Sequence, residues 1–196
     1  FGAAAAARSG DDTVILAVVP SAYGDDWPSR PENIALAKER TGEIEAACNA
    51  VVAAPKRCVG RFQLLLNRSD ALRPANSAAL RDPSLDGVYL LGGDQGIAIK
   101  VLGNTPAERS MKAAYDRGVI VAGTSAGAAV ESRTMINGYN EDFGASDGLR
   151  RAAPLIWWAW RPAWPASFSS TARASSSSRP SVLFTNRASI SRTWPS

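Results

Sequence analysis

The chain has 196 residues, of which 45% are hydrophobic and 20% charged, and its formal net charge is +4. No apolar run is long enough to cross a bilayer, which excludes a membrane-spanning protein of the helical kind. The length fits one domain with a substantial core. Cys48 and Cys58 lack metal-ligand spacing. We expect them to be buried free thiols, with a disulfide as the alternative in a secreted protein.

Strands and helices alternate along residues 1–148, a pattern that favours a doubly wound, mostly parallel α/β sheet. Residues 1–7 resemble the last turns of a helix. Thr105-Pro-Ala-Glu108 predicts a capped helix start, and Arg117-Gly118 predicts the end of that helix. The predicted strands are 13–19, 58–66, 86–91 and 119–123, and the predicted helices are 31–53, 75–82, 95–103, 105–117 and 125–136.

The sequence Gly-Thr-Ser-Ala-Gly at residues 123–127 stands between a predicted strand and a predicted helix. A sharp turn there would lift the Ser125 hydroxyl above the sheet edge, as in a nucleophile elbow. Gly123 and Gly127 have no Cβ atom to crowd such a turn. The N–H of Ala126 would then face the carbonyl that the serine attacks. The alternative is an ordinary turn whose serine caps the helix.

A second turn, residues 92–95 (Gly-Gly-Asp-Gln), follows the preceding strand. Loops at the carboxyl ends of neighbouring parallel strands meet in one crevice, so residues 92–95 and 124–126 should lie side by side. The N–H groups of Gly93 and Ala126 would then form an oxyanion hole. An ordinary turn with Asp94 capping the next helix is the alternative. The candidate substrate contacts are Gly92, Asp94, Gln95 and Thr124.

The loop at residues 20–31 follows the first strand and opens onto the same edge. Its polar and aromatic side chains could line the substrate pocket, but we interpret the segment as an irregular surface loop. These side chains are Tyr23, Asp25, Asp26, Trp27 and Arg30.

The two turns together resemble those of the cyanophycinase and dipeptidase E family of serine peptidases, over roughly residues 13–148. The pair Asp94-Gln95 is more similar to cyanophycinase. The resemblance implies a fold like the class I glutamine amidotransferases and hydrolysis of aspartyl peptides such as β-aspartyl-arginine. It implies Ser125 as nucleophile, a downstream histidine as base and no metal or organic cofactor. The expected partner is a peptide substrate rather than nucleic acid or a membrane, and a homodimer remains open.

The chain contains no histidine, so it lacks the base that this resemblance implies. A serine hydroxyl is a poor nucleophile unless a base takes its proton. None of the four lysines lies in or beside either turn, and Glu131 is interpreted as a surface carboxylate. We therefore expect little or no turnover. The alternative function is a non-catalytic binding domain with an amidotransferase-like fold. An α/β-hydrolase esterase is disfavoured because its oxyanion loop motif is absent.

The composition changes at residue 149. All 18 acidic residues lie before it, whereas seven of the 22 basic residues lie after it, all of them arginine. The Arg/Ser/Pro/Trp/Ala mixture is typical of GC-rich codons read in the wrong phase. We hypothesise a frameshift between about residues 149 and 157, with a domain at 1–148 and no domain at 149–196. A cationic arm for nucleic acid or membranes is the alternative.

The chain begins at Phe1 rather than Met, and the resemblance implies a glycine-rich strand before it. We expect a cytoplasmic protein. Secretion is the alternative, because a signal peptide would have preceded that strand.

Overall fold

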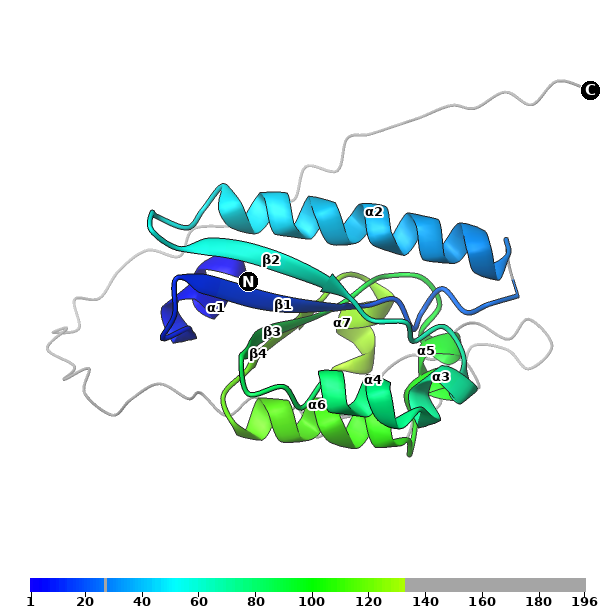
Figure 1. Ribbon diagram of the computed structural model, residues 1–196. Helices are drawn as coiled ribbons and strands as arrows, with labels where there is room; N and C mark the ends of the chain where they lie inside the picture. Colours follow the sequence, from blue (N-terminus) through cyan, green and yellow to red (C-terminus); the bar gives the residue numbers. More distant parts are fainter. Residues whose placement is uncertain (27, 133–196) are drawn as a thin grey trace, which may run out of the picture. The chain divides into compact units, whose positions relative to one another are not determined.

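The computed structural model describes residues 1–26 and 28–132, and Trp27 and residues 133–196 lie outside the described residues. Its strands form one parallel sheet in the order β2-β1-β3-β4 (Figure 1). The predicted parallel α/β sheet is therefore confirmed. The strands are β1 (Thr13–Val19), β2 (Arg57–Phe62), β3 (Leu85–Leu90) and β4 (Ile120–Gly123).

Helices cover both faces of the sheet. On one face, α1 (Gly2–Arg8) and α2 (Arg30–Asn49) pack against β1 and its neighbours. The other face carries the remaining helices, as Figure 1 shows for α4 and α6. These are α3 (Arg68–Leu72), α4 (Pro74–Ala79), α5 (Gln95–Leu102), α6 (Pro106–Asp116) and α7 (Ala126–Val130).

Strand β1 lies in the middle of these layers, and every residue of it after Thr13 is buried. Val14 and Leu16 belong to the core under α1 and α2, whereas Ile15 and Ala17 belong to the core on the opposite face. A strand that is covered on both faces is apolar throughout, without alternating polar residues. For this reason the apolar run at residues 13–19 could be predicted as a buried strand.

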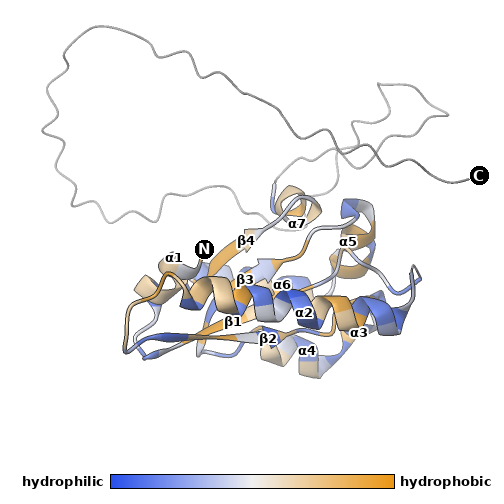
Figure 2. Cartoon of the chain, turned by 90° about the horizontal axis from the view of Figure 1, so that it is seen from above, coloured by the Kyte–Doolittle hydropathy of each residue, from blue (hydrophilic) through white to orange (hydrophobic). Residues whose placement is uncertain are grey.

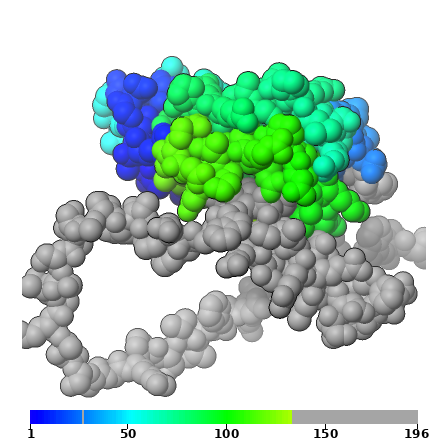
Figure 3. All heavy atoms as spheres, turned by 90° about the horizontal axis from the view of Figure 1, so that it is seen from below, coloured from blue at the N-terminus to red at the C-terminus, as the bar shows by residue number. Residues whose placement is uncertain are grey.

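Most charged residues lie on the outside of these layers, and Asp70 and Asp86 are buried exceptions. Figure 2 shows α2 with many hydrophilic residues, in contrast to the hydrophobic β4. Seen from below, α4 and α6 lie side by side on one face of the molecule (Figure 3). Among the described helices, none combines the length and the apolar character needed to cross a bilayer.

Several predicted boundaries were wrong by a few residues. Strand β2 ends at Phe62 rather than at residue 66, and α2 ends at Asn49 rather than at residue 53. The five-residue helix α3 was not predicted, because it is too short for an apolar period to show. The predicted end of α6 is confirmed, since this helix stops at Asp116 and Gly118 adopts a φ of 87°.

The expectation of free cysteines was wrong. Cys48 and Cys58 form a disulfide with their Cα atoms 6.0 Å apart. The pair forms because the end of α2 lies over the start of β2, where the Asn49 side chain accepts a hydrogen bond from the Cys58 N–H at 2.8 Å. That return of the chain depends on the sheet, and no local signal marks it.

Candidate functional site

Three loops meet at the carboxyl edge of the sheet. The backbone N–H of Thr124 donates to the Leu90 carbonyl at 3.1 Å, and the N–H of Leu91 donates to the Val19 carbonyl at 2.9 Å. A Cβ placed on Gly92 would lie 3.3 Å from the Cβ of Ser125. The turns at residues 92–95 and 124–126 therefore lie side by side, as predicted.

Ser125 occupies an unusual backbone conformation, with φ 52° and ψ −117°. This combination lies outside the allowed regions for a residue with a Cβ atom and costs about 1–3 kcal/mol. Backbone hydrogen bonds hold the turn, from the Gly127 N–H to the Thr124 carbonyl and from the Ala129 N–H to the Ser125 carbonyl, both at 2.9 Å. Ser125 is the N-cap residue of α7, but its side chain is exposed and makes no capping hydrogen bond.

Two glycines make the close approach of these turns feasible. A Cβ on Gly127 would collide with the carbonyl oxygen of Leu90. A Cβ on Gly93, whose φ is 137°, would collide with the carbonyl oxygen of Ala22. Within residues 1–26 and 28–132, neither the Gly93 N–H nor the Ala126 N–H donates a hydrogen bond. Both donors are therefore available to a ligand at the edge where Ser125 stands.

Of the other residues predicted to contact substrate, some border a cavity and one does not. Asp94 caps α5 by accepting a hydrogen bond from the Ile97 N–H at 3.0 Å, which was the alternative reading of this turn. Asp94 also lines a cavity next to Gly93, whereas Gln95, the first residue of α5, lines neither cavity described below. Thr124 is exposed beside Ser125.

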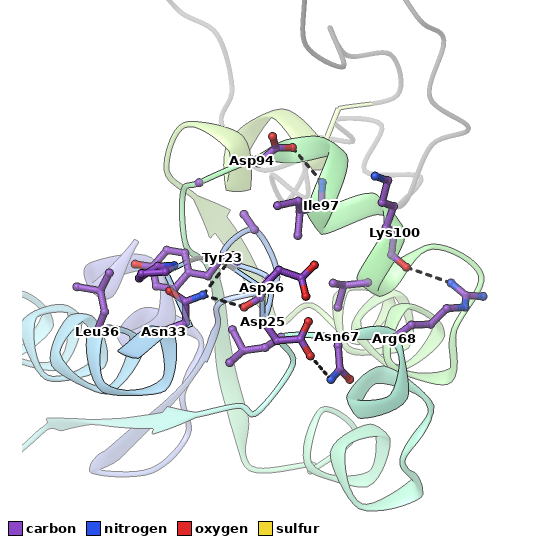
Figure 4. A pocket seen from close by; sticks show the side chains of 16 residues that line it. Tyr23, Asp25, Asp26, Asn33, Leu36, Asn67, Arg68, Asp94, Ile97 and Lys100 are labelled. Carbon is purple, nitrogen blue, oxygen red and sulfur yellow. Dashed lines mark hydrogen bonds between the residues drawn. The ribbon is translucent and has the colours of Figure 1, made fainter. Parts of the chain in front are cut away.

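The larger cavity, here the Asp25 cavity, has a volume of about 630 Å³ and opens beside Gly93 (Figure 4). The loop after β1, the start of α2, the loop before α3 and helix α5 form its walls. Residues 20–29 form an irregular loop, as interpreted, and this loop also lines the cavity through Tyr23, Asp25 and Asp26, while Trp27 lies outside the described residues. Its polar lining residues include Tyr23, Asp25, Asp26, Asn33, Asn67, Arg68, Asp94 and Lys100.

The charged side chains that line the Asp25 cavity differ in whether they have hydrogen-bond or ion-pair partners. Asp25 accepts hydrogen bonds from the side chains of Asn67 and Arg30. Arg68 donates to the carbonyls of Lys100 and Gly103 at 3.3 and 2.8 Å. The exposed Asp26 has no ion pair within the part of the chain that the structure describes. A cationic ligand would find this carboxylate open.

A second cavity of about 400 Å³, here the Tyr89 cavity, also borders Gly93. Tyr23, Gly92 and Thr124 line it, and Tyr23 and Gly93 border both cavities. The hydroxyl groups of Tyr89 and Thr124 are hydrogen-bonded to each other. Sequence reasoning missed Tyr89, although a tyrosine one residue before the end of a buried strand signals a polar group at the sheet edge.

Glu131 is not the surface carboxylate expected from the sequence. Its side chain is half-buried, its Oε1 atom is shielded from solvent, and burial raises the pKa of the carboxyl to about 7. Two of the four lysines are engaged elsewhere: Lys56 donates to the carbonyls of Ala6 and Ser9, and Lys112 pairs with Asp116.

Part of the chain is similar to known peptidases. The model of peptidase family S51 matches residues 71–146, which contain both turns. A crystal structure of a peptidase from an acI-B1 actinobacterium matches with a TM-score of 0.55 and 24% identity, over 69% of this chain and 50% of that one. That likeness shows a shared fold, and the chain spans half the length of the actinobacterial peptidase.

A structure named for peptidase E from Listeria monocytogenes EGD-e matches with a TM-score of 0.40 and 16% identity, over 75% of this chain and 62% of that one. No curated protein matches the chain. The family match covers the β3–α5 turn and the β4–α7 turn that build the site. The part of the chain that builds the site is therefore similar to peptidase family S51.

Proposed function

We propose that the chain is a serine peptidase domain of the cyanophycinase type, directed at aspartyl peptides such as β-aspartyl-arginine, with Ser125 as its nucleophile. The observation that carries the proposal is the strained backbone of Ser125 (φ 52°) between β4 and α7. Strain of this kind persists where the surrounding structure holds it, and it concentrates at functional sites. The order strand, turn and helix is the one that a nucleophile elbow requires.

The proposed chemistry uses groups at the sheet edge. The Ser125 Oγ attacks the peptide carbonyl carbon while a base takes its proton, and that proton then passes to the leaving amine. The N–H groups of Gly93 and Ala126 stabilise the oxyanion. Removing one such donor typically costs about 100- to 1000-fold in turnover. Water then releases the acyl group from Ser125.

The Asp25 cavity supports the arginyl part of this substrate. It adjoins Gly93, and the carboxylate of Asp26 is open to a guanidinium group. Burying an ion pair there would favour a basic side chain over a neutral one. We further propose that Gly92, Asp94, Gln95 and Thr124 contact the substrate around the scissile bond.

The absence of histidine from the sequence favours a second candidate function. Without an imidazole, Ser125 lacks its usual base, so we propose little or no turnover by the chain as it stands. A domain that binds aspartyl peptides without cutting them is the alternative.

On composition we also propose that the domain ends near residue 148. The disulfide between Cys48 and Cys58 favours an oxidising compartment over the cytoplasm.

Chemical rescue tests the two functions. Imidazole in the buffer should replace the missing base and accelerate the labelling of Ser125 by a fluorophosphonate, together with hydrolysis of β-aspartyl-arginine. Ser125→Ala should abolish both, whereas Ser69→Ala, which changes another exposed serine, should change neither. Peptide binding in calorimetry without labelling at any imidazole concentration would contradict the peptidase and support the binding domain.

A further inference from the structure

Glu131 follows the last residue of α7 and turns its carboxyl toward the end of β4. Its Oε1 atom lies 2.7 Å from the position that a Cβ on Gly123 would take. The same oxygen is shielded from solvent and has no hydrogen-bond partner among the described residues. Buried polar atoms are nearly always paired in folded proteins, so an orphaned oxygen against Gly123, which lies two residues before the strained serine, calls for an explanation.

The surroundings of Glu131 favour its neutral form. Helix α7 packs against α5, β4 and β3. The titratable groups of these elements are Lys100, Asp86 and Tyr89, with Asp94 at the N-cap of α5. None of these groups contributes to the shifted pKa of Glu131, whose only cause is burial. A charge at this position therefore has no compensating partner within residues 1–26 and 28–132.

Helix α7 depends on its packing. It has only five residues, and a helix this short is unstable unless tertiary contacts hold it. The turn before it must also hold Ser125 in a conformation that a free chain avoids. Contacts between the end of α7 and Gly123 are therefore part of what keeps the serine in place.

We propose that Glu131 is a positioning residue for Ser125: its neutral carboxyl holds the end of α7 against Gly123, and its ionised form releases it. An ionised carboxylate gains hydration by turning outward, and the end of the short helix moves with it. As pH rises through neutrality, the Ser125 turn loses its geometry. The catalytic consequence of this inference rests on the proposed function. The coupling between the protonation of Glu131 and the conformation of the Ser125 turn can be tested without measuring activity.

Backbone amide NMR between pH 5 and 9 tests the coupling. In the unaltered chain, the amide signals of Gly123, Ala126 and Gly127 should titrate together with a midpoint near 7, the value at which burial places the pKa of Glu131. In Glu131→Gln this titration should disappear. It should persist in Glu108→Gln, a matched control that removes another half-buried glutamate with a raised pKa. Glu131→Met, which also carries no charge, repeats the measurement if the glutamine variant is unfolded.

The outcomes separate this inference from the proposed function. Amide signals that titrate equally in Glu131→Gln, or that do not titrate in the unaltered chain, overturn the role of Glu131 whatever the activity. Failure of Ser125 to react with the fluorophosphonate and imidazole contradicts the proposed function only. Where labelling occurs, we compare its rate in the unaltered chain with its rate in Glu131→Gln at the same pH. This ratio should fall about tenfold or more between pH 6 and 8.5, because a carboxyl with a pKa near 7 is mostly neutral at the lower pH and mostly ionised at the higher one.

Discussion

The guanidinium Nη2 of Arg30 lies 2.9 Å from both carboxylate oxygens of Asp70, whose side chain has 0% exposure. Asp70 also accepts backbone hydrogen bonds from Leu66 at 3.2 Å and Asn67 at 3.4 Å. One buried carboxylate thus joins the start of α2 to the loop before α3. These are two of the walls of the Asp25 cavity, so this ion pair helps to hold the cavity in shape, together with the hydrogen bond from Asn67 to Asp25.

Arg30→Met should destabilise the protein strongly, because it removes the closer of the two cations beside the buried Asp70 carboxylate and leaves only Arg73, at 3.8 Å. We expect the free energy of unfolding to fall by about 3 kcal/mol, as for other buried pairs that lose one partner. Arg40→Met is the matched control, since Arg40 pairs with Glu43 on the exposed side of α2, where the loss of an ion pair has little effect on stability. Urea titrations that give equal losses for both variants would contradict the role of this pair.

Gly127→Ala should disrupt the Ser125 turn. Its Cβ would collide with the Leu90 carbonyl, so α7 must move away from β3. We expect a loss of roughly 1–3 kcal/mol, as in other overpacked sites, and no labelling of Ser125 even with imidazole. Gly42→Ala provides the contrast: it lies within α2 and has nothing within 4 Å of the added Cβ. That change should raise stability by about 0.5–1 kcal/mol, as measured by thermal unfolding.

Reduction of the disulfide should lower the melting temperature. Cys48 and Cys58 are separated by 10 residues, and closing a loop of this size stabilises by roughly 2–3 kcal/mol in the chain-entropy treatment. The double variant Cys48→Ser with Cys58→Ser should melt like the reduced protein and should not respond to reductant. Mass spectrometry that finds both thiols alkylated in the unreduced, folded protein would disprove the bond.

The stability of the protein should depend on pH through Glu131. Burial raises the pKa of its carboxyl from 4.5 to about 7, so the folded state holds this proton more tightly than the unfolded state does. The stabilisation is complete below pH 4.5 and is lost as pH rises through 7. Glu131→Gln should therefore become more stable than the unaltered chain by up to about 3 kcal/mol at high pH. Urea unfolding at pH 5 and pH 9 checks this, and an equal pH dependence of the two proteins would contradict it.

Sequence reasoning succeeded where the signal is local. The buried run at residues 13–19, the cap at Thr105 and the helix end at Gly118 each act within a few residues, and the structure shows all three. The pairing of the turns at residues 92–95 and 124–126 could also be predicted, because parallel strands place their carboxyl ends at one edge. Asp94 shows the limit of this approach, since its identity fits both a helix cap and a ligand contact.

The order of apolar runs, glycines and capping residues was enough to establish the parallel sheet, the two adjoining turns and the serine between β4 and α7, because these features are encoded by neighbours along the chain. The Asp25 cavity, the bond between Cys48 and Cys58, the contact of Tyr89 with Thr124 and the burial of Glu131 required the folded molecule. Each of them depends on segments that lie far apart in sequence or on solvent exclusion by several layers at once, and neither property is visible in a local pattern.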